Sequence, residues 1–227
     1  GKTLYPHMYG DDGWYGFDEL PYNWGALDTF YWSMDEADRK YVRNSEWLEF
    51  LDGNSSEFPV SVMEDEFGSI RQKMKGVSED TSSPDTRLSD NTLQFNTANQ
   101  TCLTQLMMGA LTPRFGEPLH ARVRYFDPTE RRAGIPEDVA ALVVGMTDAT
   151  TTLSLANISP VNSRKMIVQA GAYAEHQISS VEVDGEIIAV NGSFLTLELR
   201  PSTVSTIVMR LERYTNQPTF SHPWDRA

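Results

Sequence analysis

Apolar residues in the first half of the chain recur at intervals of three and four, which places them along one face of a helix. This pattern predicts four helices, over about residues 21–34, 35–51, 63–77 and 97–111. The third pattern is the most regular and predicts one buried stripe with a solvated back. Its apolar positions are Met63, Phe67, Ile70, Met74 and Val77.

Capping residues and an apolar face support the second of these helices. Asp35 has the side chain of an N-cap, and Gly53 is placed to end the helix in the left-handed conformation. Trp47, Leu48 and Leu51 are expected to face the core. The sequence therefore predicts one continuous helix over residues 35–51.

From about residue 139 the apolar period changes to two, the period of a strand with one buried face. Seven short runs follow, with turn residues between them: 139–144, 152–157, 166–169, 178–183, 186–190, 194–199 and 204–211. No helical pattern separates these runs, so a parallel arrangement with crossover helices is not favoured. The pattern predicts an antiparallel β-sandwich, with Asp184-Gly185 and Asn191-Gly192 as hairpin turns.

Together these elements predict an α+β protein, an N-terminal helical region followed by a C-terminal antiparallel β-sandwich. We divide it into residues 1–113, an aromatic loop plus about four helices; residues 114–138, a connector with one strand over 119–126; and residues 139–227, the sandwich. Residues 215–227 are expected to dock on the fold, because they are too aromatic for a free tail.

The charge and the cysteine count narrow the function classes. A formal net charge of −13 disfavours nucleic acid and anionic membranes, and no apolar run approaches the ~20 residues that span a bilayer. The single cysteine, Cys102, excludes an internal disulfide and a cysteine-based zinc site, and its apolar surroundings predict a buried thiol. Four arginines lie among acidic residues and are expected to be solvated or paired: Arg122, Arg124, Arg131 and Arg132.

Two short motifs in the sandwich region carry a resemblance to a known class of domain. One is an apolar strand that ends in an asparagine and a Ser-Pro turn, Leu153-Ser-Leu-Ala-Asn157-Ile-Ser-Pro160. The other is Leu199-Arg-Pro201-Ser-Thr203, followed by an alternating strand to Leu211. Residues 151–211 thus resemble the C-terminal β-sandwich of glycoside hydrolases, a module that also occurs in polysaccharide lyases.

Helices placed before such a sandwich resemble the end of an α/α-toroid enzyme with its β-sandwich appendage. Four helices are too few for a whole toroid. The resemblance therefore implies a C-terminal portion or subunit of a carbohydrate-active enzyme, with part of the active site on another polypeptide, an oligosaccharide ligand and an extracellular or periplasmic location. The alternative is a non-catalytic subunit or interaction module that packs on a larger partner.

The segment from Tyr9 to Glu19 combines aromatic rings, carboxylates and glycines, the residue types of a saccharide site. The candidate catalytic carboxylates are Asp11, Asp12, Asp18 and Glu19, and the candidate sugar-binding rings are Tyr9, Trp14 and Tyr15. A packed aromatic loop with solvated carboxylates is the plainer interpretation, and a calcium site is a third. No nucleotide-binding loop or serine-nucleophile motif is present, and no cofactor is expected.

Three histidines have a candidate functional role beside a structural one. His7 precedes Asp11 by four residues, and the two side chains form a candidate pair of metal ligands, for which the sequence signal is weak. His120 is expected on the surface of a strand, and His176, beside Glu175, is expected to be structural.

The helix over residues 21–34 carries aromatic side chains around most of its circumference: Trp24, Phe30, Tyr31 and Trp32. Because Phe30 and Trp32 point away from the face of Trp24 and Tyr31, this helix is expected to pack on another subunit or to line a groove. The plainer interpretation is a core face on one side with partial exposure on the other.

Overall fold

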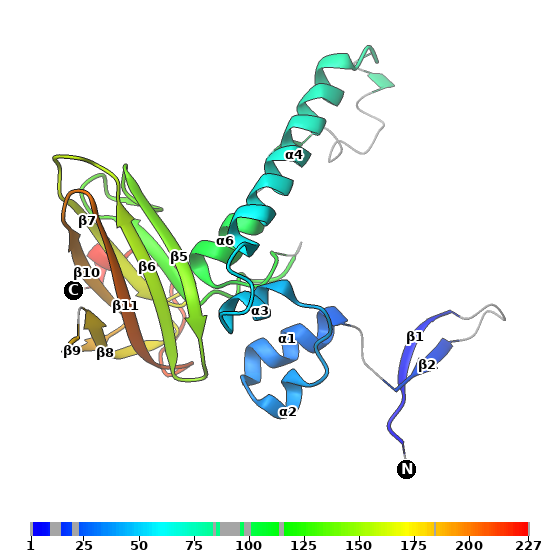
Figure 1. Cartoon of the computed structure of the whole chain (residues 1–227), viewed down its shortest axis with the longest axis horizontal. Coiled ribbons are helices and arrows are strands. Elements are labelled where there is room, and N and C mark those ends of the chain that lie inside the picture. Colours follow the sequence, from blue (N-terminus) through cyan, green and yellow to red (C-terminus); the bar gives the residue numbers. More distant parts are fainter. Residues whose placement is uncertain are drawn as a thin grey trace.

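The chain builds a helical region first and a β-sandwich second (Figure 1). The computed structural model describes residues 2–9, 15–19, 23–83, 85–86, 96–97, 101–113, 116–183 and 185–226. Helices lie within residues 23–108, and two packed antiparallel sheets follow. The α+β fold class that the sequence predicts is therefore confirmed.

Five helices of the described residues make up the helical region, and the predicted second helix is divided. They are α1 (Asn23–Ser33), α2 (Glu36–Arg39), α3 (Glu46–Leu51), α4 (Phe58–Glu79) and α6 (Thr101–Met108). Asp35 caps α2 as expected, but Ser45 caps a new helix, and Asn44 before it has a φ of 52°. The predicted helix over residues 35–51 is interrupted, because a second capping side chain and a left-handed residue are both incompatible with a continuous helix.

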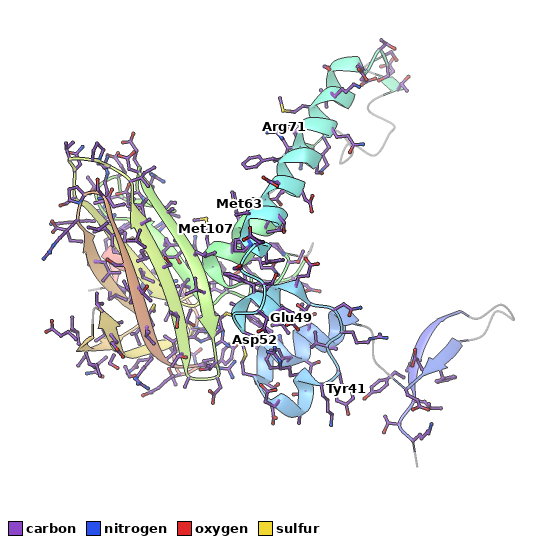
Figure 2. All side chains as sticks on the ribbon, viewed as in Figure 1. Tyr41, Glu49, Asp52, Met63, Arg71 and Met107 are labelled. Atoms are coloured by element: carbon purple, nitrogen blue, oxygen red, sulfur yellow. The ribbon has the colours of Figure 1, made fainter. Side chains whose placement is uncertain are left out.

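Helix α4 forms where the sequence predicts it, but its apolar stripe is not buried. Phe67, Met74 and Val77 are 49 %, 57 % and 40 % exposed, respectively. The helix projects from the body, so only its first turns reach the helical core (Figure 1). Figure 2 shows Met63 at the base of α4 and Arg71 on the projecting part. The expectation of a buried stripe is wrong, because periodicity shows which side is apolar but not what covers it.

All seven strands that the sequence predicts are present, and every ladder in the sandwich is antiparallel. The five-stranded sheet has the order β5 (Val139–Met146), β6 (Thr150–Asn157), β11 (Thr203–Glu212), β8 (Gln177–Val183) and β9 (Glu186–Gly192). The four-stranded sheet has the order β10 (Phe194–Leu199), β7 (Arg164–Ala170), β3 (Val123–Asp127) and β4 (Arg132–Ala133). Strand β3 comes from the predicted connector and lies inside the sheet, between β7 and β4.

One of the two predicted hairpin turns is wrong. Val183 pairs with Glu186 across the β8–β9 turn, where Gly185 has a φ of 83°. Asn191 also has a positive φ, of 52°, but it and Gly192 are the last residues of β9, and the strand that follows, β10, belongs to the other sheet. The chain therefore passes from one sheet to the other after Gly192, since local turn propensity does not determine the partner of the next strand.

The helical region and the sandwich share apolar side chains. One cluster fills the sandwich, and a second lies between the helices and strand β5. Met146 of β5 and Leu51 of α3 pack against both clusters, and Figure 2 shows Met107 of α6 beside the sheet. The two regions are therefore joined by a continuous apolar contact rather than by a linker.

The last residues of the chain run back over the sandwich. His222 and Trp224 place their rings edge-on to Phe126, each at a centroid distance of 5.9 Å. Thr219 donates its backbone N–H to the carbonyl of Tyr173. In the part of the chain that the structure describes, no helix is both long and apolar enough to cross a membrane.

Candidate functional site

A cavity of about 380 Å³ lies where the end of α1, the segment before β3, the loop after β7 and the C-terminal tail meet. We call it the aromatic cleft. It is lined by Trp32, Pro118, Leu119, His120, Tyr173, Glu175, Tyr214, Pro218, Thr219 and Phe220. A smaller hollow of about 60 Å³ adjoins it, shares Trp32 and His120, and adds Asp28 and Glu117. Small-molecule sites have volumes of roughly 300–1,000 Å³, so the aromatic cleft is large enough for a ligand.

Ring contacts hold the aromatic side chains of the cleft in place. Trp32 stacks on Tyr214 at 5.2 Å between centroids and meets His120 edge-on at 4.4 Å. Tyr173 meets Phe220 edge-on at 5.4 Å. Trp32 nevertheless stays 43 % exposed, so part of its ring is open to a ligand.

A guanidinium fixes the end of α1 relative to β11. Arg213 donates to the carbonyl of Trp32 at 2.9 Å and to that of Ser33 at 3.2 Å. These carbonyls belong to the last turn of α1, where no intrahelical donor is left for them. The two bonds place Trp32 beside Tyr214, the residue that follows Arg213 in the chain.

Glu175 supplies a carboxylate at the wall of the cleft. Its oxygens accept the backbone N–H of Ala172 at 3.2 Å and that of Tyr173 at 2.7 Å. Gly171 has a φ of 84°, and a Cβ there would come within 2.3 Å of this carboxyl group, so the turn requires glycine. Burial raises the pKa of Glu175, although the two backbone bonds favour the charged form.

His176 lies behind Glu175 as a neutral imidazole. Its Nδ1 accepts the backbone N–H of Tyr214 at 3.0 Å, and burial, helped by Arg122 and Arg213, lowers its pKa to about 4. Its Nε2 is 4.0 Å from Glu175, but a neutral ring forms no ion pair across that distance. The expected structural role of His176 agrees with this arrangement, because the imidazole joins β8 to the start of the tail.

Arg122 is buried beneath this cluster, with an exposed fraction of 1 %. Neither terminal nitrogen has a hydrogen-bond partner within the described ranges, and the guanidinium lies 5.5 Å from the ring centroid of Tyr31. Burial lowers its pKa. Its backbone N–H donates to the carbonyl of Met108, and its carbonyl accepts the N–H of Gly171, so these two segments cover the residue on both sides. The expectation that this arginine is solvated or paired is wrong, because residue 122 comes before the strand proper and lies between two covering segments.

The other three arginines of that group do have partners. Arg124 donates to the carbonyl of Ala172, and Arg131 and Arg132 lie 3.6 and 3.5 Å from carboxylate oxygens of Asp225 and Asp127. Cys102 is buried as expected and is hydrogen-bonded to Glu66. Burial and this carboxylate raise the pKa of the thiol to about 12, which disfavours the thiolate that a nucleophile requires.

Of the carboxylates and rings predicted from the sequence, the two whose side chains the structure describes, Asp18 and Glu19, do not line the aromatic cleft. Asp11, Asp12 and Trp14 lie outside the described residues, as do the side chains of Tyr9 and Tyr15. The backbones of Tyr9 and Tyr15 pair in the hairpin of β1 (Tyr5–Tyr9) and β2 (Tyr15–Asp18). Asp18 and Glu19 are exposed, and Glu19 forms an ion pair with Lys2. Figure 1 shows this hairpin apart from the helices and the sandwich.

The sequence pointed to some residues of the cleft but not to the cleft. Trp32 faces outward as predicted, whereas Phe30, expected beside it at an interface, is 5 % exposed and belongs to the helical core. His120 lies just before β3, at the cleft rather than on an open strand face. Within the described ranges, no group of three or more His, Cys, Asp or Glu side chains is placed to hold a metal ion.

Comparison with known proteins gives no relative for this chain. No protein-family model matches it, and neither the curated proteins nor the solved structures contain a match.

The titration of His176 gives a testable pH dependence of stability. Between pH 7 and pH 4 this residue is expected to lower the free energy of unfolding by about 3 kcal/mol. The unfolded imidazole, with a pKa near 6.5, binds a proton in this range, whereas the folded imidazole does so only near pH 4. The unfolded chain therefore binds more protons, and stability is lost as the pH falls.

Urea unfolding at several pH values measures this effect, with His176→Gln as the matched variant. The glutamine amide oxygen can still accept the N–H of Tyr214 but does not titrate. Glu175, with its raised pKa, acts in the opposite direction in both proteins, so the difference between their slopes isolates His176. Equal slopes in the two proteins would contradict the expectation.

Proposed function

We propose that this protein is the saccharide-binding portion or subunit of a carbohydrate-active enzyme and that the aromatic cleft holds the saccharide. One observation supports this proposal above the others: a ring-lined cavity of about 380 Å³ with a carboxylate in its wall. A sugar ring has apolar C–H faces and a polar edge of hydroxyls. It therefore needs aromatic side chains against its faces and a few fixed hydrogen-bonding groups at its rim.

Glu175 and His120 are the rim groups of this proposal. A carboxylate offers about four acceptor positions, and two of those on Glu175 are occupied by backbone N–H groups. The remaining positions can accept sugar hydroxyls. The net charge of −13 favours a neutral saccharide over a polyanionic one.

Cleavage of a glycosidic bond needs two carboxyl groups on either side of the bond. Glu175 is the carboxyl that lines the cleft within the described residues, while Asp28 and Glu117 line the adjoining hollow. This chain accordingly binds the saccharide, and another polypeptide supplies a share of the catalytic groups.

Replacing Trp32 by alanine is expected to weaken saccharide binding about 30-fold, because truncating a central aromatic anchor costs about 2 kcal/mol. Isothermal titration of a panel of neutral oligosaccharides against wild type, Trp32→Ala and Ile187→Ala measures the effect. Ile187 is exposed on β9, away from the cleft, and its variant serves as the control with unchanged affinity.

A third variant, Phe17→Ala, distinguishes the cleft from the hairpin segment that the sequence suggests. Phe17 is 65 % exposed on β2. Loss of binding in this variant with full binding in Trp32→Ala would move the site to the hairpin. Failure of the whole panel to bind the wild-type chain would count against the saccharide proposal itself.

A second candidate function, an interaction module that packs on another polypeptide, is favoured by a different observation. Helix α4 presents large apolar side chains to water along the part that projects from the body (Figure 1). Such a surface is typical of a contact with another chain.

A further inference from the structure

Helix α4 carries an exposed apolar stripe with the spacing of a coiled coil. We define the α4 stripe as Val60, Phe67, Met74 and Val77, which are 56 %, 49 %, 57 % and 40 % exposed. Its first three members are seven residues apart, and the half-buried Met63 and Ile70 fall between them at alternating steps of three and four. This is the heptad pattern with which one helix packs along another.

The two flanks of the α4 stripe differ. On one flank Glu66 is half-buried and accepts hydrogen bonds from the backbone N–H and the thiol of Cys102, so α6 lies along that side. On the other flank Glu64 and Arg71 are exposed. A partner helix therefore has access to the stripe from the side of Glu64 and Arg71.

We propose that the occupant of the α4 stripe is α4 of a second copy of this chain, in antiparallel orientation. When the two helices cross between Gly68 and Ser69, Glu64 of each copy lies two residues from the level of Arg71 of the other, about 3 Å along the axis and on the same flank. Because the two copies are related by a two-fold axis, this ion pair occurs twice in the dimer. The same register places Val60 opposite Val77 and Phe67 opposite Ile70, so the apolar and the charged positions match together.

The centre of the crossing and the surroundings of α4 fit this arrangement. A Cβ at Gly68 would meet nothing within 4 Å, so the helix surface beside Glu64 and Arg71 is open. Because α4 projects from the body, the two sandwiches of the pair lie at opposite ends (Figure 1).

A parallel pair fits the same surface less well. Equal positions would then lie at equal heights, so Glu64 would not meet Arg71, and the helix dipoles would run side by side in the same direction. The remaining charge contact of a parallel pair would use Glu66, which is already bound to Cys102.

Sedimentation equilibrium of the full chain over a wide concentration range tests the proposal. The wild type is expected to dimerise. Glu64→Arg alone and Arg71→Glu alone each replace two attractive contacts by two repulsive ones, which should raise the dissociation constant about tenfold. Asp65→Arg makes the same charge change on the opposite side of the helix and should leave the constant unchanged.

An equimolar mixture of the two single variants provides the decisive measurement. Each contact of the mixed pair again joins an arginine to a glutamate, so a mixed dimer of wild-type affinity is expected. Circular dichroism and melting temperature confirm that the variants fold, which is expected because the positions are exposed. A wild type that stays monomeric, a mixture that does not recover, or an equal loss in Asp65→Arg would overturn the proposal.

Discussion

Replacing Asn157 by alanine is expected to lower the free energy of unfolding by about 4 kcal/mol, because each buried polar group left without a partner costs about 1–3 kcal/mol. Asn157 is 1 % exposed at the end of β6. Its Nδ2 donates to the carbonyls of Asn162 and Leu199, at 2.8 and 3.0 Å, and its Oδ1 accepts the N–H of Ser159 at 3.0 Å. One side chain thus joins two sheets and the turn between β6 and β7.

Urea unfolding followed by circular dichroism measures this loss, with an unchanged dependence on urea as the sign that only stability has changed. Asn162→Ala is the matched control, because Asn162 is exposed and contributes its backbone carbonyl to the bond. Its effect is expected to stay within about 0.5 kcal/mol. A loss of less than about 1 kcal/mol in Asn157→Ala would show that the three bonds are replaced by water.

Ending the chain at Tyr214 is expected to abolish saccharide binding and to lower the melting temperature by roughly 10–20 °C, since each kcal/mol shifts a protein of this size by about 2–4 °C. The removed residues include a wall of the cleft, Pro218 to Phe220. They also include Asn216, which donates its backbone N–H to the carbonyl of Glu175 and its side chain to those of Ala174 and His176.

Calorimetry of the truncated chain, together with the oligosaccharide titration, measures both effects. Phe220→Ala separates them, because Phe220 is 86 % exposed and its loss should weaken binding while the melting temperature stays unchanged. A truncated chain that binds with full affinity would exclude the tail from the site. A melting temperature within about 3 °C of the wild type would show that the tail contributes little to stability.

The period-two pattern predicts the sandwich well because each strand presents one face to a shared interior. Strand β6 alternates between buried and part-buried positions along its whole length, and its buried residues, Leu153 and Leu155 among them, are those that the pattern selects. The same reasoning does not assign β10 to a sheet. The positive φ at Asn191 is a local feature of the chain, whereas the pairing of β10 with β7 joins segments that are distant in the sequence.

The aromatic cleft could not be predicted, because four distant segments meet there. Trp32, His120, Glu175 and Tyr214 are brought together only by the packing of α1 and the tail on the sandwich. No spacing in the sequence relates them. Arg122 shows the same limit in another form: an arginine in a strand-like alternation is expected in water, and only the segments that close over it place it inside.

The dual packing of Met146 bears on how this architecture can be inherited. A sandwich transferred alone onto a foreign chain would keep its hydrogen bonds but would expose Met146 and Leu142 on the flank that the helices now cover. Gene fusions that separate the two regions would therefore yield poorly soluble domains that aggregate through the exposed apolar surface. Recombination should transfer the helices and the sheets together as one unit.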